Sequence, residues 1–212
     1  MIITLASLKG GSGKTSLAVH LSHAISLEKK KVLLVDADPQ ASAQNWAAAR
    51  ETKPPFTVVG MARNTLHRDL PDLLDNFDHA VIDTPPRVSA LARTSILAAD
   101  LVIIPVQPSS YDVWAAAETV ALLDEAKGFK PELKAVFVVN RVLTRTLISK
   151  DVVEALAEYD VPTLSNKITQ RVAFAEASSG YTVLESEPKK SAAKEIKALS
   201  KEILKFLELK RW

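Results

Sequence analysis

The chain has 212 residues, no cysteine and a formal net charge of only +2. This length suits one domain over residues 1–212, and the lack of cysteine excludes disulfides, thiolate zinc sites and cysteine-held iron–sulfur clusters. With so small a net charge, affinity for nucleic acid requires a local basic patch. No apolar stretch is long enough to span a bilayer and no targeting segment opens the chain, so we expect a cytoplasmic protein.

A glycine-rich stretch near the start of the chain is the strongest motif. It lies between a β-type run at Ile2–Ser7 and a helical pattern that begins near Lys14. Glycines let successive N–H groups turn toward an anion, and the helix adds the positive end of its dipole. This arrangement predicts a phosphate-binding loop in which Lys14 reaches the β- and γ-phosphates and Thr15 binds Mg²⁺. The predicted nucleotide-binding residues of the loop are Lys9, Gly10, Gly11, Ser12, Gly13, Lys14, Thr15 and Ser16.

A buried strand is predicted at residues 31–35, where the apolar run is continuous rather than alternating. Asp36 and Asp38 follow it, and Pro39 ends the strand. Ligands bind at the carboxyl ends of strands in open α/β sheets. We therefore expect both acids near the nucleotide, with Asp36 nearer the magnesium ion. The alternative is a strand end capped by solvated acids.

A second apolar strand, at residues 79–82, ends in Asp83. An acid in this position is the Walker B arrangement, in which the carboxylate holds magnesium, usually through water. Two prolines after Thr84 make the following loop stiff. The alternative role for Asp83 is to cap the next helix.

The other elements follow from apolar periodicity. We expect a short strand near the sheet edge at 56–59, a helix at 66–74, strands at 100–106, 133–141 and 161–164, and helices at 113–127 and 148–159. In the predicted helix at 66–74, the residues expected to face the core are Leu70, Leu73 and Leu74. Trp114 is expected in the core or in an interface.

Three segments of the chain resemble the ParA/MinD class of ATPases. In the loop, Leu8 replaces the usual glycine and Lys9 precedes the glycine pair; the other two segments are Asp36–Gln40 and Asp83–Pro86. The resemblance implies an ATP- and Mg²⁺-dependent enzyme in which Lys9 reaches across a dimer interface to the partner's nucleotide. It also implies that Asp38 positions the attacking water. The expected catalytic residues are Lys9, Lys14 and Asp38.

The same resemblance suggests how the base is held. Asn140 closes the strand at 133–141, and a carboxamide pairs with an adenine edge through one donor and one acceptor. Arg141 is a candidate to stack over the ring, and Pro162 to border it. A loop-capping role for Asn140 and Arg141 is an equal alternative.

The last helix, predicted at 191–209, concentrates positive charge. From Lys189 onward the chain carries eight Lys and Arg against three Glu, a formal charge of +5, whereas the whole chain carries +2. Three interpretations are open: a solvated helix face, a patch that contacts the DNA backbone, or a MinD-like membrane helix that inserts Phe206, Leu207 and Trp212. We favour DNA, because the apolar stripe is needed to cover the sheet. That stripe contains Ile196, Leu199, Ile203, Phe206 and Leu207, and the candidate DNA contacts are Arg171, Lys189, Lys190 and Lys194.

The alternation of strands and helices predicts a doubly wound α/β fold with a mostly parallel sheet. No helix-turn-helix segment precedes the loop. By resemblance, we expect a partition ATPase that forms a homodimer around two ATP molecules, binds nonspecific DNA on the nucleoid, and acts with a stimulating ParB-like or cargo-adaptor protein, without a membrane. The alternatives are a MinD-like membrane ATPase and a small-molecule kinase or ligase with the same loop.

Overall fold

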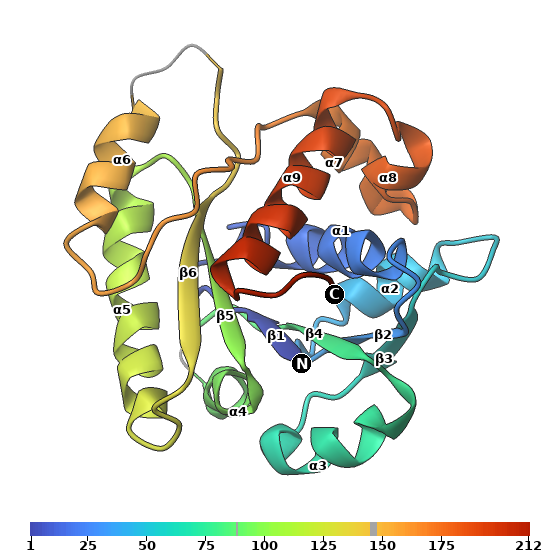
Figure 1. The fold of residues 1–212 in the computed structure, drawn as a ribbon, viewed down its shortest axis with the longest axis horizontal. Coiled ribbons are helices and arrows are strands. Elements are labelled where there is room, and N and C mark those ends of the chain that lie inside the picture. The colour runs from blue at the N-terminus through green and yellow to red at the C-terminus, as the bar shows by residue number, and fades with distance from the viewer. Residues whose placement is uncertain (88, 145–147) are drawn as a thin grey trace.

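The computed structural model describes residues 1–87, 89–144 and 148–212. It shows a parallel sheet flanked by helices (Figure 1). In this part of the chain six strands form one sheet in the order β3-β2-β4-β1-β5-β6, and every neighbouring pair is parallel. The strands are β1 (Ile2–Leu5), β2 (Val32–Asp36), β3 (Thr57–Gly60), β4 (His79–Asp83), β5 (Leu101–Val106) and β6 (Lys134–Val139). The predicted doubly wound α/β fold is confirmed.

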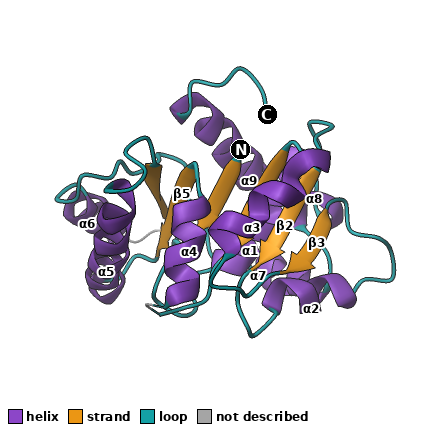
Figure 2. Ribbon diagram, turned by 90° about the horizontal axis from the view of Figure 1, so that it is seen from below, coloured by secondary structure: helices purple, strands orange, loops and turns teal. Residues whose placement is uncertain are grey.

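Helices cover both faces of the sheet, and Figure 2 shows them on either side of the strands. Helices α1, α2 and α9 pack on one face, whereas α3, α4 and α5 pack on the other. The helices are α1 (Lys14–Ser26), α2 (Ser42–Ala48), α3 (Leu66–Leu73), α4 (Ala90–Ala98), α5 (Ser110–Lys127), α6 (Ile148–Leu156), α7 (Val172–Glu176), α8 (Val183–Ser186) and α9 (Ser191–Phe206), with 3₁₀ turns at Leu74–Asn76 and Ala177–Ser179.

Alternate residues of each strand serve the two helical layers. In β1, Ile3 and Leu5 join the core under α1 and α9, whereas Ile2 joins the core under α3. Since both faces are covered, each central strand is a continuous apolar run rather than an alternating one. These continuous apolar runs are the pattern from which the sequence predicts strands β2, β4 and β5.

The strand order brings the sequence motifs to one edge of the sheet. The loop after β1 lies at its centre, and β4 pairs with both β1 and β2, so that Asp83 stands opposite Leu5 on one side and Asp36 on the other. The carboxyl ends of parallel strands at such a crossover point form the usual ligand crevice of open α/β sheets.

Two predicted features are wrong. Residues 161–164 do not form a strand; only a single bridge joins Thr163 to Phe137 of β6, because Pro162 has no N–H for a longer ladder. Leu73 does not face the core and is 43% exposed, since α3 ends there and the chain turns into the 3₁₀ segment that packs Leu74 instead.

Candidate nucleotide-binding site

The loop between β1 and α1 has the backbone that a phosphate cradle needs. Gly11 and Gly13 have φ of 77° and 94°, in the left-handed region that favours glycine. Gly13 is also constrained by space, because a Cβ atom there would lie 2.2 Å from Nδ2 of Asn140. Helix α1 begins directly at Lys14, so its free N–H groups and dipole face the loop. The loop is therefore built for an anion.

Lys14 lies buried within this loop. Its Nζ donates to the carbonyl oxygens of Ser7 at 2.9 Å and Lys9 at 3.3 Å. Burial lowers the pKa of Lys14, and the nearby carboxylates of Asp83 and Asp38 oppose that shift. The ammonium is thus held by loop carbonyls beside two acids, in position to meet a phosphate.

Asp83 is the least satisfied polar group of the site. Its side chain is fully buried, and within the described part of the chain no donor meets hydrogen-bond geometry at either carboxylate oxygen, although the Thr15 hydroxyl lies close enough to lower the pKa of Asp83. Burial raises the pKa of Asp83 to about 7, and the Asp36 carboxylate adds to the rise, while Thr15 and Lys14 oppose it. A buried carboxylate without a partner is costly unless a cation binds it. Asp83 and the Thr15 hydroxyl are hard oxygen ligands that fit Mg²⁺.

The two acids at the carboxyl end of β2 have different environments. Asp36 is buried and accepts hydrogen bonds from the N–H groups of Asp38 at 3.2 Å and Gln44 at 3.0 Å. It thereby fixes the strand end and satisfies a free donor in the first turn of α2. Asp38 is half-buried, lines the site cavity, and accepts from the N–H of Gln40 at 2.9 Å. Of the two acids, Asp38 is therefore the one that faces the cavity.

A cavity of about 630 Å³ extends from the loop toward the tail of the chain. The predicted residues Asn140 and Arg141 line it, and Asn140 Nδ2 donates to the Ser12 carbonyl oxygen at 2.7 Å. Thr169 and Gln170 also line it, although sequence reasoning did not identify them.

Pro162 is exposed and is not among the described residues that line this cavity. It lies level with Phe137, whose N–H donates to its carbonyl oxygen at 2.8 Å. The chain reaches the end of β6 only at Ile168, whose N–H donates to the Val139 carbonyl oxygen at 3.0 Å. The segment that borders the cavity is therefore marked in the sequence by the apolar residue Ile168 and not by Pro162.

Lys9 does not line its own cavity. Its ammonium forms an ion pair with Asp112, in the first turn of α5. The predicted loop residues that do line the cavity are Gly10, Gly11, Gly13, Lys14, Thr15 and Ser16. Ser12 is buried, and its hydroxyl has no partner among the described residues.

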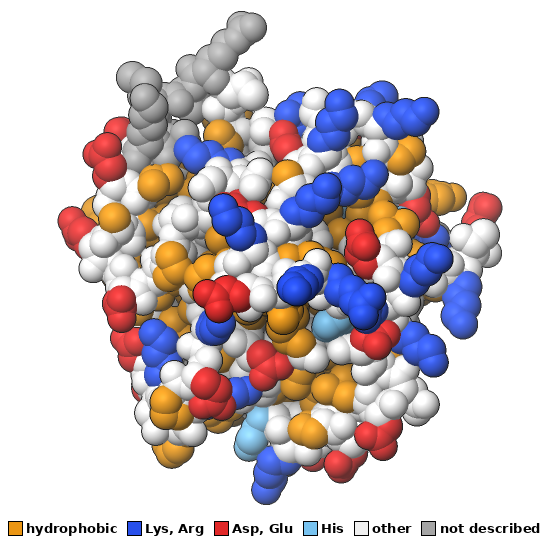
Figure 3. All heavy atoms as spheres, in the orientation of Figure 1, with side chains coloured by type: hydrophobic (Ala, Val, Ile, Leu, Met, Phe, Trp, Pro, Cys, Tyr) orange, Lys and Arg blue, Asp and Glu red, His pale blue; other side chains and the backbone are white. Residues whose placement is uncertain are grey.

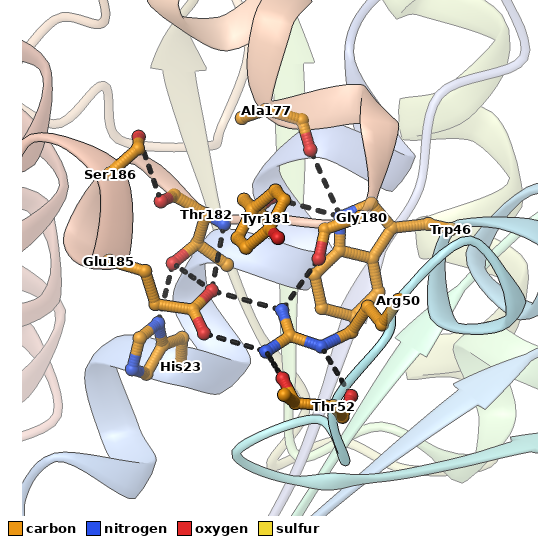
Figure 4. Close-up of polar contacts among 10 residues, drawn as sticks. All are labelled: His23, Trp46, Arg50, Thr52, Ala177, Gly180, Tyr181, Thr182, Glu185 and Ser186. Carbon is orange, nitrogen blue, oxygen red and sulfur yellow. Dashed lines mark hydrogen bonds and ion pairs between the residues drawn. The ribbon is translucent and has the colours of Figure 1, made fainter.

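Helix α2, which follows Asp38, is tied to the tail by the cluster in Figure 4. Trp46 Nε1 donates to the carbonyl oxygens of Ala177 at 3.1 Å and Tyr181 at 2.9 Å. Arg50 stacks over the Trp46 ring, and its guanidinium nitrogens lie 2.7 and 3.1 Å from the two oxygens of Glu185. The acid-bearing segment and the tail therefore form one connected unit.

The predicted DNA contacts differ in their surroundings. Arg171 is half-buried and pairs with Glu195 at 2.6 Å, and Lys190 pairs with Glu187 at 2.7 Å. Lys189 and Lys194 are exposed. Figure 3 shows blue basic side chains gathered over α7, α8 and α9. Basic side chains therefore do gather on this surface, but the Arg171 guanidinium is engaged in an ion pair with Glu195.

Helix α9 separates its charges by face. Glu195 accepts from Thr169 and Arg171, and Glu202 accepts from the N–H groups of Ser165 and Asn166. Both acids therefore clamp the segment that borders the cavity. The exposed lysines recur at helical spacing away from the buried stripe, at Lys194, Lys197, Lys201 and Lys205.

The chain is similar in sequence to known nucleotide-binding proteins. The family model described as CobQ/CobB/MinD/ParA nucleotide binding domain matches residues 3–182. The maintenance of carboxysome distribution protein A of Halothiobacillus neapolitanus is 28% identical, with 95% of each chain covered. The chromosome-partitioning ATPase Soj of Thermus thermophilus is 28% identical, with 95% of this chain and 94% of that protein covered.

Solved structures show the same fold. The septum site-determining protein MinD of Pyrococcus horikoshii, in complex with Mg-ADP, superposes with a TM-score of 0.80 at 20% identity, covering 97% of this chain and 96% of that one. Cobyrinic acid a,c-diamide synthase of Mycobacterium smegmatis, with an ATP analogue and magnesium, gives 0.82 at 21% identity, covering 98% and 95%. Among the described helices, none has the length and apolar character needed to cross a bilayer.

Proposed function

The chain belongs to the CobQ/CobB/MinD/ParA family of nucleotide-binding domains, and on that premise we propose that it is a magnesium-dependent partition ATPase that forms an ATP-bound homodimer on nonspecific DNA. The observation that carries the proposal is the buried Asp83 carboxylate, which lies beside Lys14 and Thr15 and has no donor in hydrogen-bond geometry among the residues that the structure describes. A catalytic phosphate site needs fixed positive charge together with a metal ligand, and this crevice has both.

Each side chain has one task in this proposal. Lys14 and the loop N–H groups bind the phosphates, and Asp83 and Thr15 would hold Mg²⁺, which would supply positive charge to the transferred phosphoryl group. Asp38, on the cavity wall, orients the attacking water. No covalent intermediate is required. Asn140, Arg141, Thr169 and Gln170 surround the base end of the nucleotide.

The active site is proposed to be shared between two subunits. Lys9 lies outside the lining of its own cavity, with a side chain that is 35% exposed. A lysine in this position serves a neighbouring subunit more readily than its own nucleotide. Turnover of the isolated protein is then slow, because the complete site forms only in the dimer.

The lysine stripe of α9 is the proposed DNA surface. Glu195 and Glu202 accept backbone N–H groups of the 165–169 segment, and within the described part of the chain no carboxylate forms an ion pair with Lys194, Lys201 or Lys205, so these exposed lysines are open to phosphates. Phosphate contacts of this kind bind without sequence preference and weaken with salt. The apolar face of α9 is buried in the core, with Ile196, Leu199 and Ile203 nearly inaccessible, and Trp212 is buried as well. This packing argues against the membrane-inserting alternative.

A stimulating protein that carries DNA or another cargo completes the proposal. Relatives of this chain are named for chromosome partitioning and for carboxysome distribution. We propose that the ATP-bound dimer sits on the nucleoid and that hydrolysis, triggered by the partner, releases it. The cargo named differs between these relatives, whereas the proposed cycle is the same for either cargo.

The ATPase mechanism is tested by three substitutions that should fail differently. Lys14→Gln should abolish binding of a fluorescent ADP, whereas Lys9→Ala should bind it normally and lose hydrolysis. Asp38→Ala should accumulate an ATP-bound dimer in sedimentation velocity. Lys53→Gln, at an exposed lysine that does not line the cavity, is the control and should resemble wild type. Normal turnover by Asp38→Ala would remove Asp38 from the mechanism.

A further inference from the structure

Lys9 is held at the surface by a residue that none of the sequence motifs includes. The Lys9 ammonium forms an ion pair with Asp112, which is the third residue of α5. Asp112 is 103 residues away in the chain, and its side chain is only 4% exposed. A carboxylate in the first turn of a helix is stabilised as an anion by the helix dipole. Asp112 is therefore a fixed, charged partner.

Asp112 is held rigidly relative to the loop because α5 contacts the loop at two positions, Asp112 and Thr119. The Thr119 hydroxyl, two turns after Asp112, accepts a hydrogen bond from the Leu8 N–H at 3.3 Å. Val113 and Ala116 are buried between these positions. Consecutive residues Leu8 and Lys9 are thus both held by the same helix, which leaves the Lys9 side chain little freedom to turn toward its own cavity.

Two aromatic residues near Asp112 in sequence are exposed. Tyr111 and Trp114, on either side of Asp112 in sequence, are 72% and 66% exposed and contact each other edge to face with ring centres 5.4 Å apart. An ammonium group has three donors, and Asp112 accepts through one oxygen, so Lys9 retains donors for a second anion. The Lys9 side chain is itself 35% exposed, and the two aromatic residues near its partner in sequence are exposed as well.

We propose that Asp112 is the positioning residue for Lys9: it keeps the ammonium directed across the subunit face, ready for the phosphates of the second copy. This inference rests on the proposed shared site. A long lysine side chain loses much rotamer freedom when it binds. An ion pair that fixes it beforehand raises the fraction of dimers in which it reaches the phosphate, so the effect should appear in turnover rather than in nucleotide binding.

The test compares Asp112→Asn and Asp112→Glu with wild type in steady-state ATP hydrolysis at saturating Mg-ATP. We expect Asp112→Asn to lower kcat about tenfold with an unchanged KM for ATP, and Asp112→Glu, which keeps the charge, to recover most of the loss. Affinity for fluorescent ADP should stay within twofold, because Lys9 lies outside its own cavity. Asp124→Asn, at an exposed acid on the same helix, is the matched control and should be neutral.

A double-mutant cycle separates this inference from the proposed function. In a Lys9→Ala background, Asp112→Asn should have no further effect on turnover. If Lys9→Ala alone turns over normally, the shared site itself is wrong. If Lys9→Ala is inactive but Asp112→Asn matches wild type, only the positioning role fails. If Asp112→Asn and Asp112→Glu both weaken ADP binding or lower the melting temperature alike, Asp112 is a structural residue and the proposal is overturned.

Discussion

Asn140 Nδ2 donates to the Ser12 carbonyl oxygen across 128 residues of sequence, at 2.7 Å, and this bond fixes the phosphate loop to the end of β6. The same amide nitrogen fills the space that a Cβ atom of Gly13 would need. The carboxamide expected to read the base thus also holds the loop in shape.

Asn140→Ala should therefore weaken both the fold and the nucleotide site. Leaving the buried Ser12 carbonyl without its donor costs about 2 kcal/mol in free energy of unfolding, and the loosened loop should bind Mg-ADP about tenfold more weakly. Urea unfolding and ADP titration measure the two effects. Asn76→Ala, at an exposed position in the 3₁₀ turn after α3, is the control. Unchanged ADP affinity in Asn140→Ala would show that the loop needs no support from β6.

Asp83 should make the metal-free protein less stable as pH rises. Its pKa is about 7 in the folded protein, because of burial, against about 3.9 in an unfolded chain. Between these values the folded state binds a proton that the unfolded state lacks. The free energy of unfolding therefore falls with rising pH by up to about 1.4 kcal/mol per unit, until the folded pKa is passed.

The comparison that isolates this effect is Asp83→Asn against wild type, unfolded by urea with chelator present. Burial lowers the pKa of His20 to about 4, which changes stability in the opposite direction over part of this range, but it does so in both proteins. The stability advantage of Asp83→Asn should be small at pH 5 and grow toward pH 7.5. A difference that stays constant with pH would mean that Asp83 is ionised throughout.

The parts of the site that sequence predicted are those encoded locally. The glycine loop, Lys14 and the acids at the ends of β2 and β4 lie within short motifs, and residues that are close in each motif are also close in space. The pairing of Lys9 with Asp112 and of Arg171 with Glu195 depends on how distant helices pack, and no local pattern reveals it. Likewise, the segment that borders the cavity was misplaced at Pro162, because its register against β6 is set by Ile168 and by the Glu195 and Glu202 clamps.

Trp114 should report formation of the proposed dimer. It is exposed, whereas Trp46 and Trp212 are buried, so acrylamide quenching of tryptophan fluorescence is dominated by Trp114. Mg-ATPγS should reduce quenching in a manner that depends on protein concentration, because an interface that covers α5 shields the ring, and ADP should not. Trp114→Phe removes the reporter and should abolish the change. Equal quenching in ATPγS and ADP would place the interface elsewhere.

The Arg50–Glu185 pair should hold the tail against α2. The Arg50 side chain is 4% exposed, and removing its partner leaves that charge largely buried. Glu185→Gln should therefore lower the free energy of unfolding by about 2 kcal/mol, measured by urea unfolding. Glu187→Gln, whose partner Lys190 is well exposed, should change stability by less than about 0.5 kcal/mol. Equal effects of the two substitutions would show that the Arg50–Glu185 pair does not stabilise the contact between α2 and the tail.

The most direct test of the proposed function is co-sedimentation of the protein with random-sequence DNA at moderate salt, in Mg-ATPγS and in Mg-ADP. We expect binding only in Mg-ATPγS, with log affinity falling against log salt at about −0.9 per neutralised phosphate. Changing Lys194, Lys201 and Lys205 together to Ala should flatten that slope by nearly three such units. Binding that is equal in both nucleotides, or absent in both, would contradict a nucleotide-gated DNA carrier.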